Sequence, residues 1–136
     1  KVPYVGSVGA CDMVNFWAPP TVPQRFQGRR FYPHNPNITL MRTTPEECRR
    51  LGEIVAEKLN LSRGPVSVLI PLRGWSMIDA PGEPFWWPEA DQAFTIALKA
   101  RLRPDIPVLE IDANVNDAEF ARRCAETLLE GMRDEG

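Results

Sequence analysis

Polar residues with chemical potential follow three segments that the sequence predicts as strands. They are Asp12, Asn15, Arg42, Thr43, Gly74, Ser76, Asp79 and Gly82. Ligands of open parallel sheets bind beyond the carboxyl ends of the strands, so parallel strands would gather these residues around one cleft. Asn15, Arg42 and Ser76 would anchor a ligand through hydrogen bonds. Gly74 and Gly82 would allow close backbone approach, and Asp79 would contact a hydroxyl group or a metal ion.

Two of these residues also have a purely structural interpretation. Asp79 can close an Asx turn ahead of Pro81. Arg42 lies just before a helix start, where free N–H groups favour an anion. However, Glu46 and Glu47 already place negative charge on that turn, which favours a structural or interface pair for Arg42 over a phosphate contact.

His34 is the only histidine and gives the alternative hypothesis, an enzyme. With Asp79 it could form an acid/base pair acting on a small phosphorylated or carboxylated metabolite, provided that the two side chains lie within one water of each other. A loop histidine on the surface is the other interpretation. No other catalytic residue is suggested. No metal site is expected, because the three cysteines are far apart and lack a Cys-x-x-Cys pair.

The segment 72–87 is long for a connection between a strand and a helix, and it carries Trp75, Trp86 and Trp87. Together with the basic segment 25–30, these indoles could form a homodimer face. Packing of the indoles within the segment itself is the alternative. We therefore expect a protein-interaction or dimerisation role as a third hypothesis, with a homo-oligomer as its product.

The predicted elements alternate between strands and helices. Strands are expected over 2–8, 38–42, 66–71 and 106–111, and helices are expected to begin at Pro45, at Pro88 and after an Asn116 cap. Thr44 and Glu47 form a capping box. The order predicts one domain over 1–136 with a three-layer, Rossmann-like α/β fold and about four parallel strands. Segments 17–37 and 72–87 are expected to be long loops, the first rich in proline and arginine.

Composition excludes several classes of protein. The chain has 136 residues, 43% hydrophobic and 25% charged, with a net charge of −2, which does not suggest nucleic-acid binding. No apolar run approaches the ~18 residues of a membrane span. The odd cysteine count predicts a reducing, cytoplasmic location. P-loop, Gly-x-Gly-x-x-Gly, Gly-x-Ser-x-Gly and His-Glu-x-x-His motifs are missing from the sequence.

Five strings resemble one poorly characterised family, described as ATP-binding and typified by the plant tobamovirus-resistance protein. They are Gly9-Ala10-Cys11-Asp12-Met13-Val14-Asn15-Phe16, His34-Asn35-Pro36, Leu40-Met41-Arg42-Thr43-Thr44-Pro45-Glu46-Glu47, Asp79-Ala80-Pro81-Gly82-Glu83-Pro84-Phe85 and Asn116-Asp117-Ala118-Glu119-Phe120-Ala121. The resemblance implies two Rossmann-like domains, of which this chain matches the last part of the second. It also implies ATP, with Mg²⁺, as a ligand of the longer protein. The glycine-rich loops lie earlier in the family's sequence, so this part alone is not expected to hold ATP. The plant member binds a viral replication protein.

Overall fold

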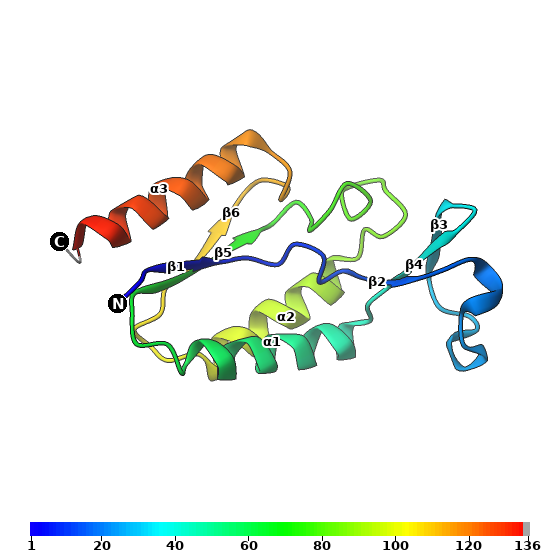
Figure 1. Ribbon diagram of the computed structural model, residues 1–136, viewed down its shortest axis with the longest axis horizontal. Coiled ribbons are helices and arrows are strands. Elements are labelled where there is room, and N and C mark those ends of the chain that lie inside the picture. Colours follow the sequence, from blue (N-terminus) through cyan, green and yellow to red (C-terminus); the bar gives the residue numbers. More distant parts are fainter. Residues whose placement is uncertain (135–136) are drawn as a thin grey trace.

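The computed structural model describes residues 1–134, and its main body is a three-stranded parallel sheet between helices (Figure 1). The strands are β1 (Tyr4–Gly6), β5 (Val66–Pro71) and β6 (Val108–Ile111), paired in the order β1-β5-β6. The helices are α1 (Pro45–Leu59), α2 (Pro88–Arg101) and α3 (Ala118–Asp134). The predicted α/β class and the parallel pairing are confirmed.

The sheet separates two apolar layers. Helices α1 and α2 pack together below one face, while α3 lies across the other (Figure 1). The larger core lies on the side of α1 and α2, and its buried residues are Val8, Cys48, Ala56, Val66, Val68, Ile70, Trp75, Ala90, Phe94, Leu98 and Ile106. A smaller cluster lies on the side of α3, formed by Leu69, Ile111, Ala113 and Phe120. The expected three-layer arrangement is therefore present.

Helix α1 begins where the sequence predicts. The Thr44 side chain accepts a hydrogen bond from the Glu47 N–H, the Glu47 side chain accepts one from the Thr44 N–H, and Pro45 occupies the first turn. Gly52 faces α2 so closely that a Cβ added there would lie 2.4 Å from the Phe94 carbonyl oxygen. A glycine therefore sets the distance between the two helices.

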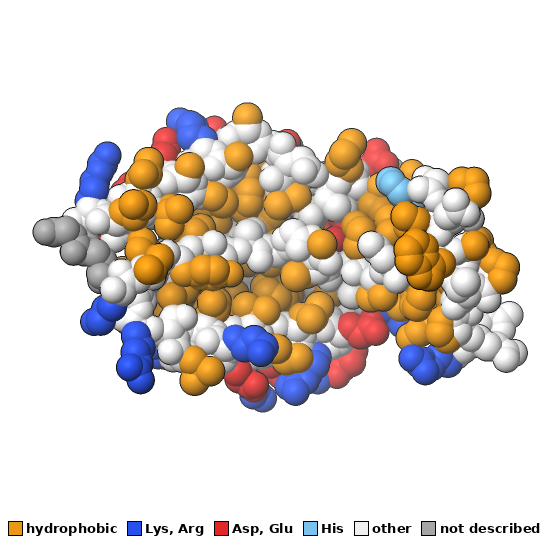
Figure 2. Space-filling view, viewed as in Figure 1, with side chains coloured by type: hydrophobic (Ala, Val, Ile, Leu, Met, Phe, Trp, Pro, Cys, Tyr) orange, Lys and Arg blue, Asp and Glu red, His pale blue; other side chains and the backbone are white. Residues whose placement is uncertain are grey.

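Residues 13–42 form a second, antiparallel sheet that we call the arm. Its strands are β2 (Met13–Phe16), β3 (Phe31–Asn35) and β4 (Ile38–Arg42), in the order β2-β4-β3, with short 3₁₀ turns at Pro19–Thr21 and Gln24–Phe26. The arm projects beyond the end of the main sheet, and hydrophobic side chains gather on its surface (Figure 2).

The arm corrects two predictions. Segment 38–42 is a strand, but it does not belong to the parallel sheet, which has three strands rather than about four. Segment 17–37 is not wholly loop, since it contains β3. The reason is a tight hairpin, in which the Asn35 side chain accepts a hydrogen bond from the Asn37 N–H and turns β3 back onto β4. A chain that reverses within two residues pairs antiparallel with its neighbour.

Element boundaries differ in smaller ways. The first and last strands of the main sheet are shorter than the predicted 2–8 and 106–111. Helix α3 begins after Asp117, whose carbonyl oxygen accepts hydrogen bonds from the Phe120 and Ala121 N–H groups, so the predicted Asn116 cap is wrong. Asn116 instead donates its N–H to the side chain of Asn114. None of the helices within residues 1–134 is long and apolar enough to cross a membrane.

Candidate functional site

Arg42 lies at the centre of a buried polar network that several predicted site residues share. Its Nε donates to the Phe85 carbonyl oxygen at 2.8 Å, and its Nη2 lies 2.5 Å from Asp91 Oδ1 and 3.4 Å from Asp79 Oδ2. Arg42 and Asp79 are completely buried. These contacts favour the interpretation of Arg42 as a member of a structural ion pair.

Asp12 extends the network toward the loop that follows β1. Ser76 Oγ donates to Asp12 Oδ2 at 2.6 Å and accepts from the Asp79 N–H at 2.9 Å. Thr43 donates its N–H to the Asp12 carbonyl oxygen at 2.9 Å, and its hydroxyl donates to the Cys11 carbonyl oxygen at 2.9 Å. Five of the eight predicted residues are thereby brought together from three distant segments.

Burial changes what these five residues can do. Four of them, namely Asp12, Arg42, Thr43 and Asp79, are buried, so they hold the loops in place beneath the surface. The predicted Asx turn at Asp79 is replaced by a longer link, in which Asp79 Oδ2 accepts from the Trp75 N–H at 3.0 Å. The network therefore fixes the loops at the edge of the main sheet where the strands have their carboxyl ends.

The other three predicted residues lie outside this network. Gly74 is buried with a φ of +110°, and a Cβ there would lie 1.7 Å from the Asp79 carbonyl oxygen, so this glycine is required by the loop itself. Asn15 and Gly82 are exposed. Within residues 1–134 an added Cβ at Gly82 would meet no atom closer than 4 Å, which leaves its backbone open to approach.

The network holds more negative than positive charge, because three aspartates surround one guanidinium. Burial and the neighbouring Asp79 carboxyl raise the pKa of Asp91 to about 8. Burial also raises the pKa of Asp12. Two carboxylate oxygens, Asp12 Oδ1 and Asp79 Oδ1, are buried without a hydrogen-bond partner among the described residues. Asp91 therefore keeps its proton to a much higher pH than an ordinary aspartic acid.

A cavity of about 270 Å³ opens between α2 and the carboxyl-terminal halves of β5 and β6. We call it the edge cavity. Its lining residues are Ile70, Pro71, Leu72, Trp75, Pro88, Asp91, Gln92, Thr95, Ile96, Lys99 and Glu110. Lys99 Nζ lies 3.3 Å from Glu110 Oε2. None of the eight predicted residues is among the described residues that line it, but Asp91 joins the cavity to the network.

Trp75 lines the edge cavity and also carries an unused hydrogen-bond donor. Its ring packs edge-on against Phe94 at 5.3 Å and is 1% exposed. In the part of the chain that the structure describes, its buried Nε1 has no hydrogen-bond partner. Buried polar groups are normally paired, so an orphaned donor beside a cavity points to a missing acceptor. The sequence left open whether Trp75 lies at a dimer face or packs within its own segment, and it gave no site role to Asp91, an acidic residue in the first turn of α2.

The catalytic pair proposed for the enzyme hypothesis is not assembled. His34 is exposed in β3 of the arm, whereas Asp79 is completely buried against Arg42. No hydrogen bond within residues 1–134 joins the two side chains. Asp79 has no route to a substrate held by His34, so the structure gives this pair no support.

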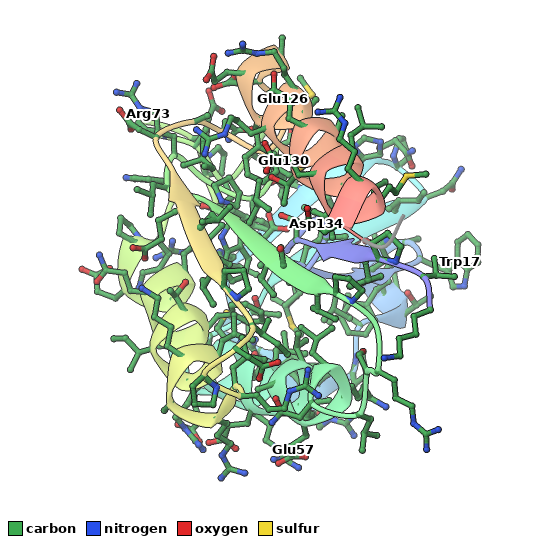
Figure 3. The ribbon with its side chains drawn as sticks, turned by 90° about the vertical axis from the view of Figure 1, so that its left-hand side faces the viewer. Trp17, Glu57, Arg73, Glu126, Glu130 and Asp134 are labelled. Atoms are coloured by element: carbon green, nitrogen blue, oxygen red, sulfur yellow. The ribbon has the colours of Figure 1, made fainter. Side chains whose placement is uncertain are left out.

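The tryptophans of segment 72–87 pack against their own chain. Trp75 is buried in the core, while Trp86 and Trp87 are half-buried. The Arg30 guanidinium lies 4.3 Å from the Trp87 ring centroid and donates to the Trp86 carbonyl oxygen at 3.2 Å. By contrast, Trp17 projects away from the molecule and is 72% exposed (Figure 3).

Metal ligation finds no support in the described part of the chain, residues 1–134, where no cluster of three His, Cys, Asp or Glu side chains could hold an ion. One oxygen of each carboxylate in the network contacts Arg42 or Ser76.

Comparisons with known proteins agree across almost the whole chain. A family model described as "Uncharacterised protein family (UPF0261) C-terminal domain" matches residues 1–132. A UPF0261 protein of Mesorhizobium japonicum is 50% identical over 129 residues, covering 93% of this chain and 32% of that protein. A UPF0261 protein of Rhizobium meliloti is 54% identical over 122 residues, covering 88% of this chain and 31% of that protein.

A plant protein is also similar. The ToMV resistance protein Tm-1 of Solanum lycopersicum is 42% identical over 132 residues, covering 96% of this chain and 18% of that protein. The chain thus spans about a third or less of the length of the curated relatives it matches.

Proposed function

This chain belongs to the UPF0261 family, as its C-terminal domain, and on that premise we propose that it is a small-ligand-binding α/β module of a longer protein. The ligand lies in the edge cavity and is in the first instance a nucleotide, ATP with Mg²⁺. The function of the family is uncharacterised.

The unpartnered Trp75 N–H is the observation that carries the proposal. The donor is buried, and its residue lines a cavity at the edge where open parallel sheets bind ligands. An acceptor nitrogen or oxygen of a bound molecule would satisfy it. A free donor also rejects molecules without an acceptor, because they would leave the N–H desolvated and unpaired.

Charge and size decide which part of a nucleotide the edge cavity takes. Its volume of about 270 Å³ suits a base and a ribose better than a whole triphosphate, since pockets for drug-sized ligands span ~300–1,000 Å³. Glu89 places negative charge in the first turn of α2, which disfavours phosphates there. The triphosphate would extend away from α2, toward sequence supplied by the rest of the longer protein.

Calorimetric titration of the full-length protein with ATP and Mg²⁺, and with adenosine, tests this assignment. Ile96 lines the cavity and is 69% exposed, so Ile96→Trp should obstruct the mouth without disturbing the core. We expect it to weaken binding of both molecules at least tenfold. Leu61→Trp is the matched control, because Leu61 is 81% exposed and is not a lining residue among those described.

Equal affinity in the wild type and in Ile96→Trp would remove the edge cavity from consideration. Absence of any adenosine or ATP binding by the wild type would refute the nucleotide assignment.

Similarity to the plant proteins does not imply a role in virus resistance for this chain. The ToMV resistance protein is 42% identical and the ToMV susceptible protein of the same plant is 40% identical, each over 132 residues. Because both match this segment about equally, likeness here does not distinguish resistance from susceptibility.

Self-association through the arm is a second candidate, favoured by the exposed Trp17. Large exposed aromatic side chains are enriched at protein interfaces. Sedimentation of the wild type and of Trp17→Ser over a wide concentration range tests it. A wild type that stays monomeric throughout would end this candidate.

A further inference from the structure

We propose that the arm carries a second binding site, for an uncharged aromatic molecule with one hydroxyl group that hydrogen-bonds to Thr39. This site is separate from the edge cavity and does not depend on the function proposed above.

The arm carries a cavity of about 520 Å³ that is open to solvent, which we call the arm cavity. It lies between one face of the antiparallel sheet and the 3₁₀ turns that fold over that face. Its lining residues are Pro19, Pro20, Val22, Pro23, Gln24, Gln27, Phe31, Pro33 and Thr39. The volume falls within the ~300–1,000 Å³ typical of ligand sites, and such sites combine apolar walls with a few polar groups.

Thr39 supplies the polar group at the floor of the arm cavity. It lies on the central strand β4, directly opposite Pro33 of β3 and Phe16 of β2. Residues opposite one another in an antiparallel pair share a face, and Phe31, two residues before Pro33, shares it as well. Since Phe31 and Pro33 both line the cavity, the Thr39 side chain is directed into it.

The Thr39 hydroxyl is unsatisfied. The residue is 5% exposed, and its Oγ1 has no hydrogen-bond partner among residues 1–134. A buried hydroxyl without a partner is unfavourable, and most such groups in proteins are paired. A ligand hydroxyl can donate to Oγ1 or accept from it, so one hydroxyl group is sufficient.

The walls determine the rest of the ligand. Proline rings and the Phe31 ring offer flat apolar surfaces that suit an aromatic body. No charged residue lines the arm cavity in the described part of the chain. The nearby arginines are engaged elsewhere, since Arg25 lies 4.8 Å from the Phe26 ring centroid and Arg29 pairs with Glu47 at 2.5 Å. A charged group of the ligand would therefore find no counter-charge on these walls, and the ligand is neutral.

Equilibrium titration with 2-naphthol and with naphthalene tests the assignment, because the two probes differ by one hydroxyl group. We expect the wild type to bind 2-naphthol about tenfold more tightly than naphthalene, the effect of one additional hydrogen bond. Thr39→Val, which keeps the side-chain shape, should abolish that difference and leave naphthalene affinity unchanged. Its melting temperature should not fall, since Oγ1 makes no hydrogen bond within residues 1–134.

Three further variants separate this site from the edge cavity. Thr95→Val makes the same change at a buried threonine that lines the edge cavity, and it should preserve the preference for 2-naphthol. Val22→Trp should fill the arm cavity and abolish binding of both probes. Ile96→Trp should leave both affinities unchanged, so failure of the nucleotide proposal would not affect this result.

The proposal is overturned if Thr39→Val retains the preference for 2-naphthol, or if Val22→Trp still binds both probes. It is equally overturned if 2-naphthol only dissociates an oligomer of the wild type. That result would show that a second copy of the chain, rather than a small molecule, occupies the arm cavity.

Discussion

Arg42 is a fully buried cation whose three nitrogens are directed at a carbonyl oxygen, a threonine hydroxyl and two aspartates. A buried charge of this kind is tolerated only with partners, and removing one partner typically costs about 3–5 kcal/mol. Its role is therefore to hold the arm, the loop before α2 and α2 itself in one arrangement.

The raised pKa of Asp91 predicts an unusual pH dependence of stability. The pKa of Asp91 is raised from 3.8 to about 8 in the folded protein, so the folded state binds the proton more tightly than the unfolded state. From about pH 4 to about pH 8 this group therefore makes the free energy of unfolding fall as pH rises. The slope reaches at most about 1.4 kcal/mol per pH unit.

Urea denaturation of the wild type and of Asp91→Asn between pH 4.5 and 8.5 checks this prediction. The difference in unfolding free energy between the two should shift in favour of Asp91→Asn as pH rises. Asp112→Asn is the control, because Asp112 is an exposed partner of Arg73, and its difference from the wild type should stay constant. A constant difference for Asp91→Asn as well would contradict the raised pKa.

Ala10 is the one residue other than glycine with a positive φ, +63°, within residues 1–134. It lies in a turn closed by the hydrogen bond from the Cys11 N–H to the Val8 carbonyl oxygen at 3.0 Å. Because the left-handed conformation disfavours a Cβ, Ala10→Gly should stabilise the protein by about 1 kcal/mol in thermal or urea unfolding. Ala100→Gly, on the exposed surface of α2, should instead destabilise it by about 1 kcal/mol. Equal losses in both variants would rule out strain at Ala10.

For single residues, the sequence predicted which side chains lie close together but not that they are buried. Asp12, Arg42, Ser76 and Asp79 were grouped because they follow strands, and they do lie together. Their burial could not be predicted, since it depends on how the loop 72–87 folds over them. Asp91 was missed because a carboxylate in a first helical turn has an ordinary explanation.

Among the elements, the contact between α1 and α2 depends on Gly52. A methyl group there would lie 2.4 Å from the Phe94 carbonyl oxygen and 3.1 Å from the Ala97 Cβ. Backbone cannot yield as a flexible side chain can, so Gly52→Ala should destabilise the protein by about 3 kcal/mol despite its gain in helix propensity.

Chemical denaturation measures this loss, and Gly9→Ala is its matched control. Within residues 1–134 an added Cβ at Gly9 meets no atom closer than 4 Å, so Gly9→Ala should change stability by less than about 0.5 kcal/mol. A Gly52→Ala variant as stable as the wild type would mean that the helices lie further apart.

The strands show why local patterns predicted some elements better than others. Segment 66–71 is a run of β-branched and apolar residues, and it is the central, buried strand of the parallel sheet. Segment 38–42 has a similar composition, yet it pairs antiparallel in the arm. Composition predicts a strand, whereas the choice of sheet depends on the turn at Asn35 and on long-range contacts.

For the whole molecule, the two faces of the main sheet are covered unequally. Below one face α1 and α2 bury a large core, whereas in the described part of the chain α3 is the only helix on the other. Phe120 is buried near the start of α3, but Leu128, Leu129 and Met132, further along, are exposed. The first turns of α3 therefore hold it to the sheet more firmly than the last.

Two alanine substitutions in α3 test this difference by thermal unfolding. Phe120→Ala should cost about 3–5 kcal/mol, because it leaves a cavity against the sheet. Leu129→Ala, at a side chain that is 51% exposed, should cost less than about 1 kcal/mol. Similar losses at both positions would show that α3 is docked along its whole length.

The resemblance to a family ran along nearly the whole chain, and the family assignment followed from it. Neither cavity could be foreseen in the same way, because each lies between elements that only the folded chain brings together.

One consequence follows from the position of β4. Thr39 at one end of this strand borders the arm cavity, and Arg42 at the other end grips Asp91 on the wall of the edge cavity. Residues 39–42 of β4 thus connect the arm cavity with the edge cavity, which are otherwise separate. A ligand that displaced this strand in one cavity would change the affinity of the other cavity for its own ligand, and thermodynamic reciprocity would make the two changes equal in size.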